Sequence, residues 1–196
     1  MYDREVALKT AFNRAVASLL GVEEKDYYSK LATDQIISLK TVLSDINNLI
    51  TLRLAFSLAS WICDRFNVSE GERKKILDTI KSSKPNTNGY DIELSVPNII
   101  AEIKCNIPIN AGRVYGSAQQ NGLRKDIEGL LAGKSKSSKK ADKSTKLLGL
   151  YDTPEVRAAT EHFVKNLPAN LKQKLIIDPE QGNVLGNQHV YIVFVK

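Results

Sequence analysis

Residues 90–107, YDIELSVPNIIAEIKCNI, decide the predicted fold and carry the charges that point to a function. YDIEL (90–94) has the composition of a strand and follows PNTNG (85–89), a cluster of turn residues. Val96-Pro97-Asn98 then predicts a chain reversal, and IIAEIKCNI (99–107) predicts a buried strand interrupted by two charges. We therefore expect a hairpin of two short strands.

The two charges of the second strand, Glu102 and Lys104, share one of its faces, because successive side chains of a strand point to opposite sides. The hairpin lays Asp91 beside them. Two carboxylates can hold a divalent cation that polarises a phosphoryl oxygen and lowers the pKa of a bound water. An ammonium group can steady the attacking hydroxide or the developing negative charge. The three charges therefore indicate metal-dependent phosphodiester hydrolysis.

At these residues the sequence resembles the PD-(D/E)XK nuclease superfamily, in which an aspartate on one strand is followed by (D/E)-x-K on the next strand of an αβββαβ core. Here these are Asp91 and then Glu102-Ile103-Lys104. The resemblance covers residues 50–196 and implies that Asp91 and Glu102 bind Mg²⁺, for which Mn²⁺ can substitute. It also implies that the carbonyl of Ile103 adds a ligand and that Lys104 assists the nucleophilic water. Tyr90 stands where the family name has proline.

The function implied by this resemblance is hydrolysis of DNA by a restriction-type endonuclease with Asp91, Glu102 and Lys104 as catalytic residues. We expect a homodimer, since cutting both strands needs two sites and palindromic DNA mirrors two-fold protein symmetry. Two alternatives stay open. Glu102 and Lys104 form an ion pair on a solvated sheet face in a noncatalytic nucleic-acid-binding protein, or the chain is a subunit of a larger nuclease complex.

The segments that follow the hairpin predict alternating helices and strands. Leu123, Ile127 and Leu130 place a helix over 117–133, and Thr153 with Pro154 caps a second one over 154–167. TKLLGLYD (145–152) and HVYIVFVK (189–196) predict strands. The expected fold class is therefore α/β, a restriction-endonuclease-like αβββαβ core with a mixed sheet and crossovers, plus an N-terminal helical region.

The first half of the chain predicts helices only. A helix with Asp3 and Glu5 in its first turn has apolar residues at three- and four-residue spacing from Leu8 to Leu19. An apolar stretch from Thr33 to Phe66 predicts a largely buried helical segment, broken around Asn47 and Asn48. Ser69 and Glu72 form a capping box for a helix that ends before Pro85. We expect this region, residues 1–84, to pack on a core formed by residues 85–196.

Composition favours a protein that binds a polyanion. The formal net charge is +6, and neutralising phosphates releases counterions. Residues 133–146, GKSKSSKKADKSTK, hold six of the lysines and predict a solvated loop that either grips the DNA backbone or is merely exposed. Cys63 and Cys105 lack a metal-ligand spacing. The charged N-terminus and the short uncharged run Leu54–Cys63 predict a cytoplasmic protein with no membrane partner.

Further polar residues are candidates for the site. Glu93 shares a face with Asp91 and is either an accessory ligand or an exposed neighbour. The weaker candidates each have an ordinary structural explanation as well: Glu5, Arg113, Tyr115, Gln119, Gln120, His162 and His189.

Overall fold

The structure is a computed structural model that describes residues 3–83, 89–109 and 112–196. Within these ranges it is a mixed α/β protein with a five-stranded sheet. The chain divides into two compact units, one up to Ile46 and one from Asn47 to Lys196. The second unit holds every described strand and the three residues of the predicted site.

The first unit consists of helix α1 (Arg4–Leu20), the short 3₁₀ turn η1 (Tyr28–Lys30) and the beginning of helix α2 (Thr33–Arg65). Asp3, which the sequence placed in the first turn of this helix, is its N-cap and accepts hydrogen bonds from the backbone N–H groups of Glu5 and Val6. Glu5 itself forms an ion pair with Lys9, 2.6 Å away. The helix therefore explains Glu5 without a role in a site.

Helix α2 is continuous from Thr33 to Arg65, so the predicted break around Asn47 and Asn48 is wrong. Asparagine costs a helix only a fraction of a kilocalorie per mole, which the many leucines and isoleucines of the segment offset. The expected burial holds only for the later part of the helix, because Leu43 and Leu49 are more than half exposed.

By length and composition, α2 is also the one helix of the described residues that is apolar enough to cross a membrane. The prediction from sequence considered only the uncharged run Leu54–Cys63 and so missed the longer apolar segment. The uncharged run Leu54–Cys63 packs largely into the protein interior, since Leu54, Leu58 and Ile62 are buried in the core of the second unit.

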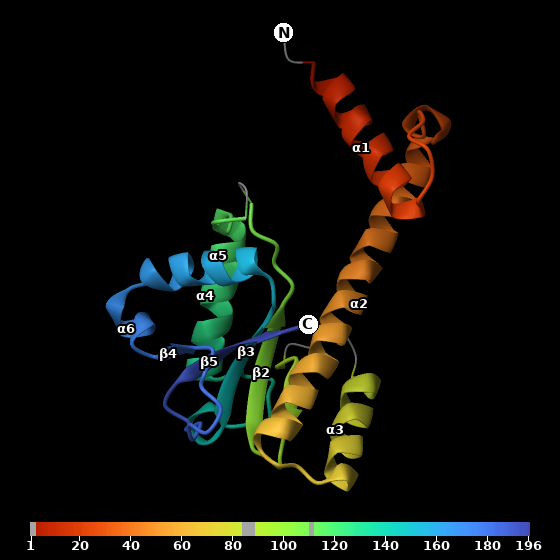
Figure 1. Ribbon diagram of the computed structural model, residues 1–196. Coiled ribbons are helices and arrows are strands. Elements are labelled where there is room, and N and C mark those ends of the chain that lie inside the picture. The colour runs from red at the N-terminus through yellow and green to blue at the C-terminus, as the bar shows by residue number, and fades with distance from the viewer. Residues whose placement is uncertain (1–2, 84–88, 110–111) are drawn as a thin grey trace. The chain divides into compact units, whose positions relative to one another are not determined.

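The sheet has the strand order β1-β2-β3-β5-β4. Its strands are β1 (Ile92–Leu94), β2 (Ile99–Lys104), β3 (Thr145–Tyr151), β4 (Leu175–Ile177) and β5 (Val190–Val195). β1 pairs with β2 in antiparallel fashion and the other neighbours are parallel. The predicted hairpin and mixed sheet are thus confirmed, and helices make the parallel crossovers between β2, β3 and β4 (Figure 1).

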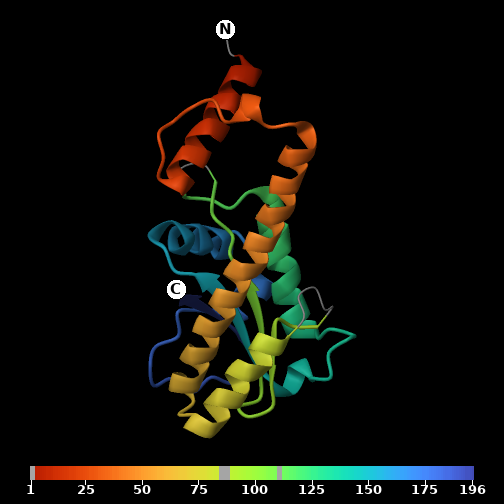
Figure 2. The ribbon, with the colours of Figure 1, turned by 90° about the vertical axis from the view of Figure 1, so that its right-hand side faces the viewer.

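Helices cover both faces of the sheet. The later part of α2 and helix α3 (Glu70–Ser82) lie side by side over one face, as Figure 2 shows. Helices α4 (Ser117–Ala132) and α5 (Pro154–Lys165) cover the other. Each layer closes its own apolar core, one around Leu58 and Ile103 and one around Ile100 and Ile127. The central strands are therefore buried on both sides.

Several details differ from the expectation. The short strand β4 and helix α6 (Ala169–Lys172) were not predicted. Within the described residues two strands precede α4, whereas an αβββαβ core has three. The later part of α2 and helix α3 belong to the compact unit that begins at Asn47. Residues 84–88, which include most of the predicted turn segment 85–89, and residues 110–111 lie outside the described residues.

Two predicted caps are present. The Ser69 hydroxyl accepts a hydrogen bond from Glu72 N–H, and the Thr153 hydroxyl accepts one from Val156 N–H. These caps fix where α3 and α5 begin.

Candidate active site at the end of the β1–β2 hairpin

The hairpin register brings Asp91 and Glu102 together. Ile92 pairs with Ala101 in the antiparallel ladder, so Asp91, one residue earlier, comes opposite Glu102, one residue later. A carboxylate oxygen of Asp91 accepts a hydrogen bond of 2.8 Å from the backbone N–H of Ile103. This bond ties the aspartate to the strand that carries the Glu-x-Lys sequence.

Glu102 and Lys104 lie on the face of the sheet that α4 covers, while Ala101 and Ile103 pack into the core under α2 and α3. The predicted alternation along β2 is therefore confirmed. Lys104 Nζ lies 3.1 Å from Asp126 Oδ2 on α4. The side chain of Lys104 keeps 33% of its surface exposed to solvent.

The carboxylate of Glu102 is buried, with only 3% of the residue exposed, and it forms an ion pair with Lys134. Lys134 follows the last turn of α4 and also donates a hydrogen bond of 2.8 Å to the carbonyl of Gly89. Its ammonium lies 5.2 Å from the ring centroid of Tyr90. A lysine from the basic segment 133–146 is thus part of the site.

Burial dominates the proton affinities of the carboxylates. It raises the pKa of Glu102 to about 7, aided by the charge of Asp91 and opposed by Lys134. It also raises the pKa of Asp91, although the Ile103 N–H and Lys104 act against it. Burial works to lower the pKa of Lys104, but Asp126, Asp91 and Glu102 together raise it. The site therefore holds a protonated lysine next to carboxylates that ionise reluctantly.

Two carboxylate oxygens of the same charged cluster lack a hydrogen bond. Among the described side chains, three buried polar atoms make no hydrogen bond, and two of them are Glu102 Oε1 and Asp126 Oδ2. Each forms an ion pair with a lysine ammonium, Glu102 with Lys134 and Asp126 with Lys104. A buried carboxylate oxygen is costly unless a cation or donor compensates it, and here the two lysine ammonium groups do so.

The donors present fit a magnesium ion. Mg²⁺ is commonly held by one or two carboxylates together with water and substrate phosphates, and Asp91 and Glu102 supply such a pair. The described part of the chain has no group of three or more His, Cys, Asp or Glu side chains arranged for a metal. Two carboxylates alone could hold Mg²⁺ only if water or substrate oxygens completed its coordination. Ile103 contacts Asp91 through its N–H, and its carbonyl remains a ligand by resemblance only.

Asp126 and Lys134 were not singled out from the sequence. Asp126 sits two residues after Arg124 in what looks like the polar side of an amphipathic helix, and Lys134 is one lysine among six. Only the packing of α4 on the sheet brings both to β2. The expectation that segment 133–146 is only a solvated loop is also wrong at its two ends. Lys134 forms an ion pair with Glu102. Lys146 is buried in β3 and donates to the carbonyls of Ser144 and Asn187.

The remaining candidates have structural roles or lie elsewhere. Glu93 accepts a hydrogen bond from Tyr90 N–H. Gln119 and Gln120 bind backbone groups at the start of α4, and Tyr115 is buried against Thr160. Arg113 is exposed, Asn166 donates to the backbone carbonyl of His162, and the His189 ring lies near that of Tyr191.

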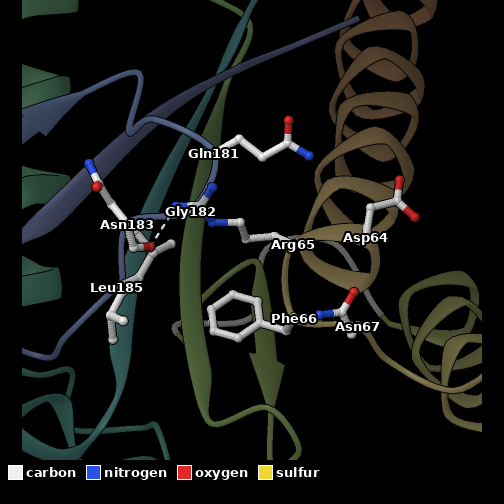
Figure 3. Close-up of a pocket in the computed structure, with 9 residues that line it drawn as sticks. Asp64, Arg65, Phe66, Asn67, Gln181, Gly182, Asn183 and Leu185 are labelled. Carbon is white, nitrogen blue, oxygen red and sulfur yellow. Dashed lines mark hydrogen bonds between the residues drawn. The ribbon is translucent and has the colours of Figure 1, made fainter.

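A pocket of about 450 Å³ lies apart from these charges (Figure 3). The end of α2 and the loop 181–185 line it, and none of its residues belongs to the acidic cluster. The guanidinium of Arg65 is already used there, since it donates to the carbonyls of Glu180 and Asn183. We base the function on the charged cluster because the pocket contains a single carboxylate, Asp64, and a committed arginine.

The sequence matches no family model, no curated protein and no solved structure at a significant level. The fold and the site geometry are therefore the basis for a functional assignment.

Proposed function

We propose that this protein is a metal-dependent nuclease that hydrolyses DNA phosphodiester bonds with Asp91, Glu102 and Lys104, as a restriction-type endonuclease of the PD-(D/E)XK kind. The observation that carries the proposal is the register of the hairpin, which sets Asp91 opposite Glu102 while Lys104 shares the face of Glu102. The order of two strands before α4 departs from the αβββαβ arrangement, so the proposal depends on the site more than on the fold.

In this proposal the two carboxylates bind Mg²⁺ or Mn²⁺. The bound ion supplies Lewis-acid polarisation of a phosphoryl oxygen and a water of lowered pKa. Lys104 contributes a protonated ammonium that stabilises negative charge developing on the phosphate. Asp126 holds that ammonium in position from α4. The chain also carries a net charge of +6, which favours approach to a polyanion.

A specific observation supports a second candidate, a noncatalytic nucleic-acid-binding protein or nuclease-complex subunit. Both critical charges of β2 already have partners, Glu102 with Lys134 and Lys104 with Asp126. Two such ion pairs can hold α4 against the sheet in a protein that catalyses no reaction. However, Asp91 lies opposite Glu102 in a buried place, and the closeness of two carboxylates costs free energy that a divalent cation between them would offset.

The test is cleavage of supercoiled and linear DNA by the wild type, Lys104→Ala and Lys125→Ala, each with Mg²⁺, Mn²⁺ or EDTA. Lys125 is an exposed lysine of α4, so its variant removes an equal charge outside the site. We expect metal-dependent cutting by the wild type and Lys125→Ala and its loss in Lys104→Ala, with circular dichroism unchanged. DNA binding without cleavage in any metal would support the noncatalytic candidate, and equal cutting by Lys104→Ala would overturn the assigned site.

A further inference from the structure

Lys134 occupies a three-sided cation site. Its ammonium forms an ion pair with Glu102, donates to the carbonyl of Gly89 and lies over the ring of Tyr90. A carboxylate, a carbonyl oxygen and an aromatic face all attract a cation. The site is built from residues before β1, on β2 and after α4.

The backbone positions the lysine there. Gly133 has a φ of 95° and its N–H donates to the carbonyl of Gly129, which ends α4 and turns the chain so that Lys134 comes next. Residues with a side chain rarely adopt this φ. The Tyr90 hydroxyl donates to the same Gly129 carbonyl at 3.1 Å. The turn and the aromatic wall of the site are therefore fixed to one another.

Resting on the proposed function, we propose that Lys134 is a built-in cation that occupies Glu102 in the metal-free protein and competes with the divalent cation for this carboxylate. Glu102 is buried, and a counter-charge is needed to keep it ionised. A divalent cation at the same carboxylate repels the ammonium. The Gly89 carbonyl and the Tyr90 ring are contacts of Lys134 that do not involve Glu102, so the ammonium keeps partners when the carboxylate binds a metal.

A purely structural ion pair makes a different prediction. If Lys134 served only to join α4 to the sheet, its removal would destabilise the fold and leave the affinity of the folded protein for a divalent cation unchanged or lower. Competition predicts that removal of its charge strengthens binding. The sign of the change in affinity therefore separates the two.

The experiment is isothermal titration calorimetry with MgCl₂ at pH 9 on the wild type, Lys134→Met, Lys134→Arg and Lys136→Met. Methionine keeps the unbranched apolar stem without the charge, and Lys136 is an exposed lysine of the same segment. We expect Lys134→Met to bind Mg²⁺ about tenfold more tightly than the wild type. Lys134→Arg and Lys136→Met should bind like the wild type. Circular dichroism verifies folding, and Lys134→Gln replaces Lys134→Met if that variant unfolds.

The outcomes separate this proposal from the proposed function. Binding by the wild type with equal or weaker binding by Lys134→Met would overturn the competition and leave the nuclease proposal standing. Absence of Mg²⁺ binding in every folded variant would overturn the metal centre itself, and the role of Lys134 with it.

Discussion

Lys104 Nζ lies 3.1 Å from Asp126 Oδ2, so a residue on helix α4 fixes the lysine of the Glu-x-Lys strand. Lys104 ends strand β2 and Asp126 lies on helix α4, so the two residues are too far apart in the sequence to form a short motif. Asp126 thereby acts as a positioning residue for the proposed chemistry.

We expect Asp126→Asn to lower the rate of DNA cleavage by about 10–100-fold, the range found when a partner that orients a metal-site group is lost. The loss should fall on kcat, with KM and the affinity for Mg²⁺ nearly unchanged, because Asp126 is not among the proposed ligands. Glu128→Gln, an exposed change on the same helix, is the control and should cut normally. Cutting by Asp126→Asn at the normal kcat would show that Lys104 needs no such partner.

The stability of the metal-free protein should depend on pH through Glu102. Between pH 4.5 and about 7 the native carboxyl keeps a proton that the unfolded chain releases. The free energy of unfolding therefore falls as pH rises through this window, by about 3 kcal/mol if Glu102 alone is counted. Urea denaturation in EDTA at pH 4.5, 6 and 7.5 measures this change.

Glu102→Gln provides the comparison, since it removes the titrating group. It should show a smaller fall over the same pH range, with the remainder due to Asp91, whose pKa is also raised. The opposite trend is expected for metal binding, because ionised Glu102 forms as pH rises past 7, so Mg²⁺ affinity and cleavage should increase there. Parallel denaturation profiles of wild type and Glu102→Gln would contradict the assignment.

Tyr90→Phe should destabilise the protein by about 1 kcal/mol, because the Gly129 carbonyl loses the hydroxyl that donates to it while the ring over Lys134 remains. Thermal unfolding measures the effect. Tyr151→Phe removes a hydroxyl from a partly exposed tyrosine and should change the melting temperature little. An equal effect of both changes would show that the bond to Gly129 contributes no stability.

Gly149→Ala should destabilise the fold by about 1–3 kcal/mol, the usual cost of overpacking a core. A methyl group at Gly149 would lie 2.9 Å from a methyl carbon of Leu58, whose side chain is fully buried between α2 and the sheet. Gly122→Ala is the matched control on α4, where the added carbon meets no atom within 4 Å. It should stabilise the helix by about 0.5–1 kcal/mol. Urea denaturation of both variants shows whether the contact between Gly149 and Leu58 leaves no room for a methyl group.

The hairpin and its alternation could be predicted from the sequence because both depend on local patterns. The turn residues, the apolar runs and the two-residue period of a strand suffice to place Glu102 and Lys104 on one face. Helix caps at Ser69 and Thr153 are equally local, and both were found. The pairing of Asp91 with Glu102 also followed, since a hairpin fixes its own register.

The partners of these charges could not be predicted in the same way. Asp126 and Lys134 reach β2 through the packing of α4, which depends on long-range contacts between apolar faces. The continuity of α2 was missed because two adjacent asparagines suggest a break, although the rest of the helix tolerates them. Strand β4 has only three residues, too few for a periodic signal.

The use of both faces of β2 restricts how this chain can change length. An insertion or deletion of one residue inside the strand would exchange its faces, sending Ile103 toward α4 and Glu102 into the aliphatic layer under α2. The same slip would move the Ile103 N–H away from Asp91. Homologous chains should therefore vary in length outside the strands of the hairpin, while the residues from Ile99 to Lys104 keep their spacing.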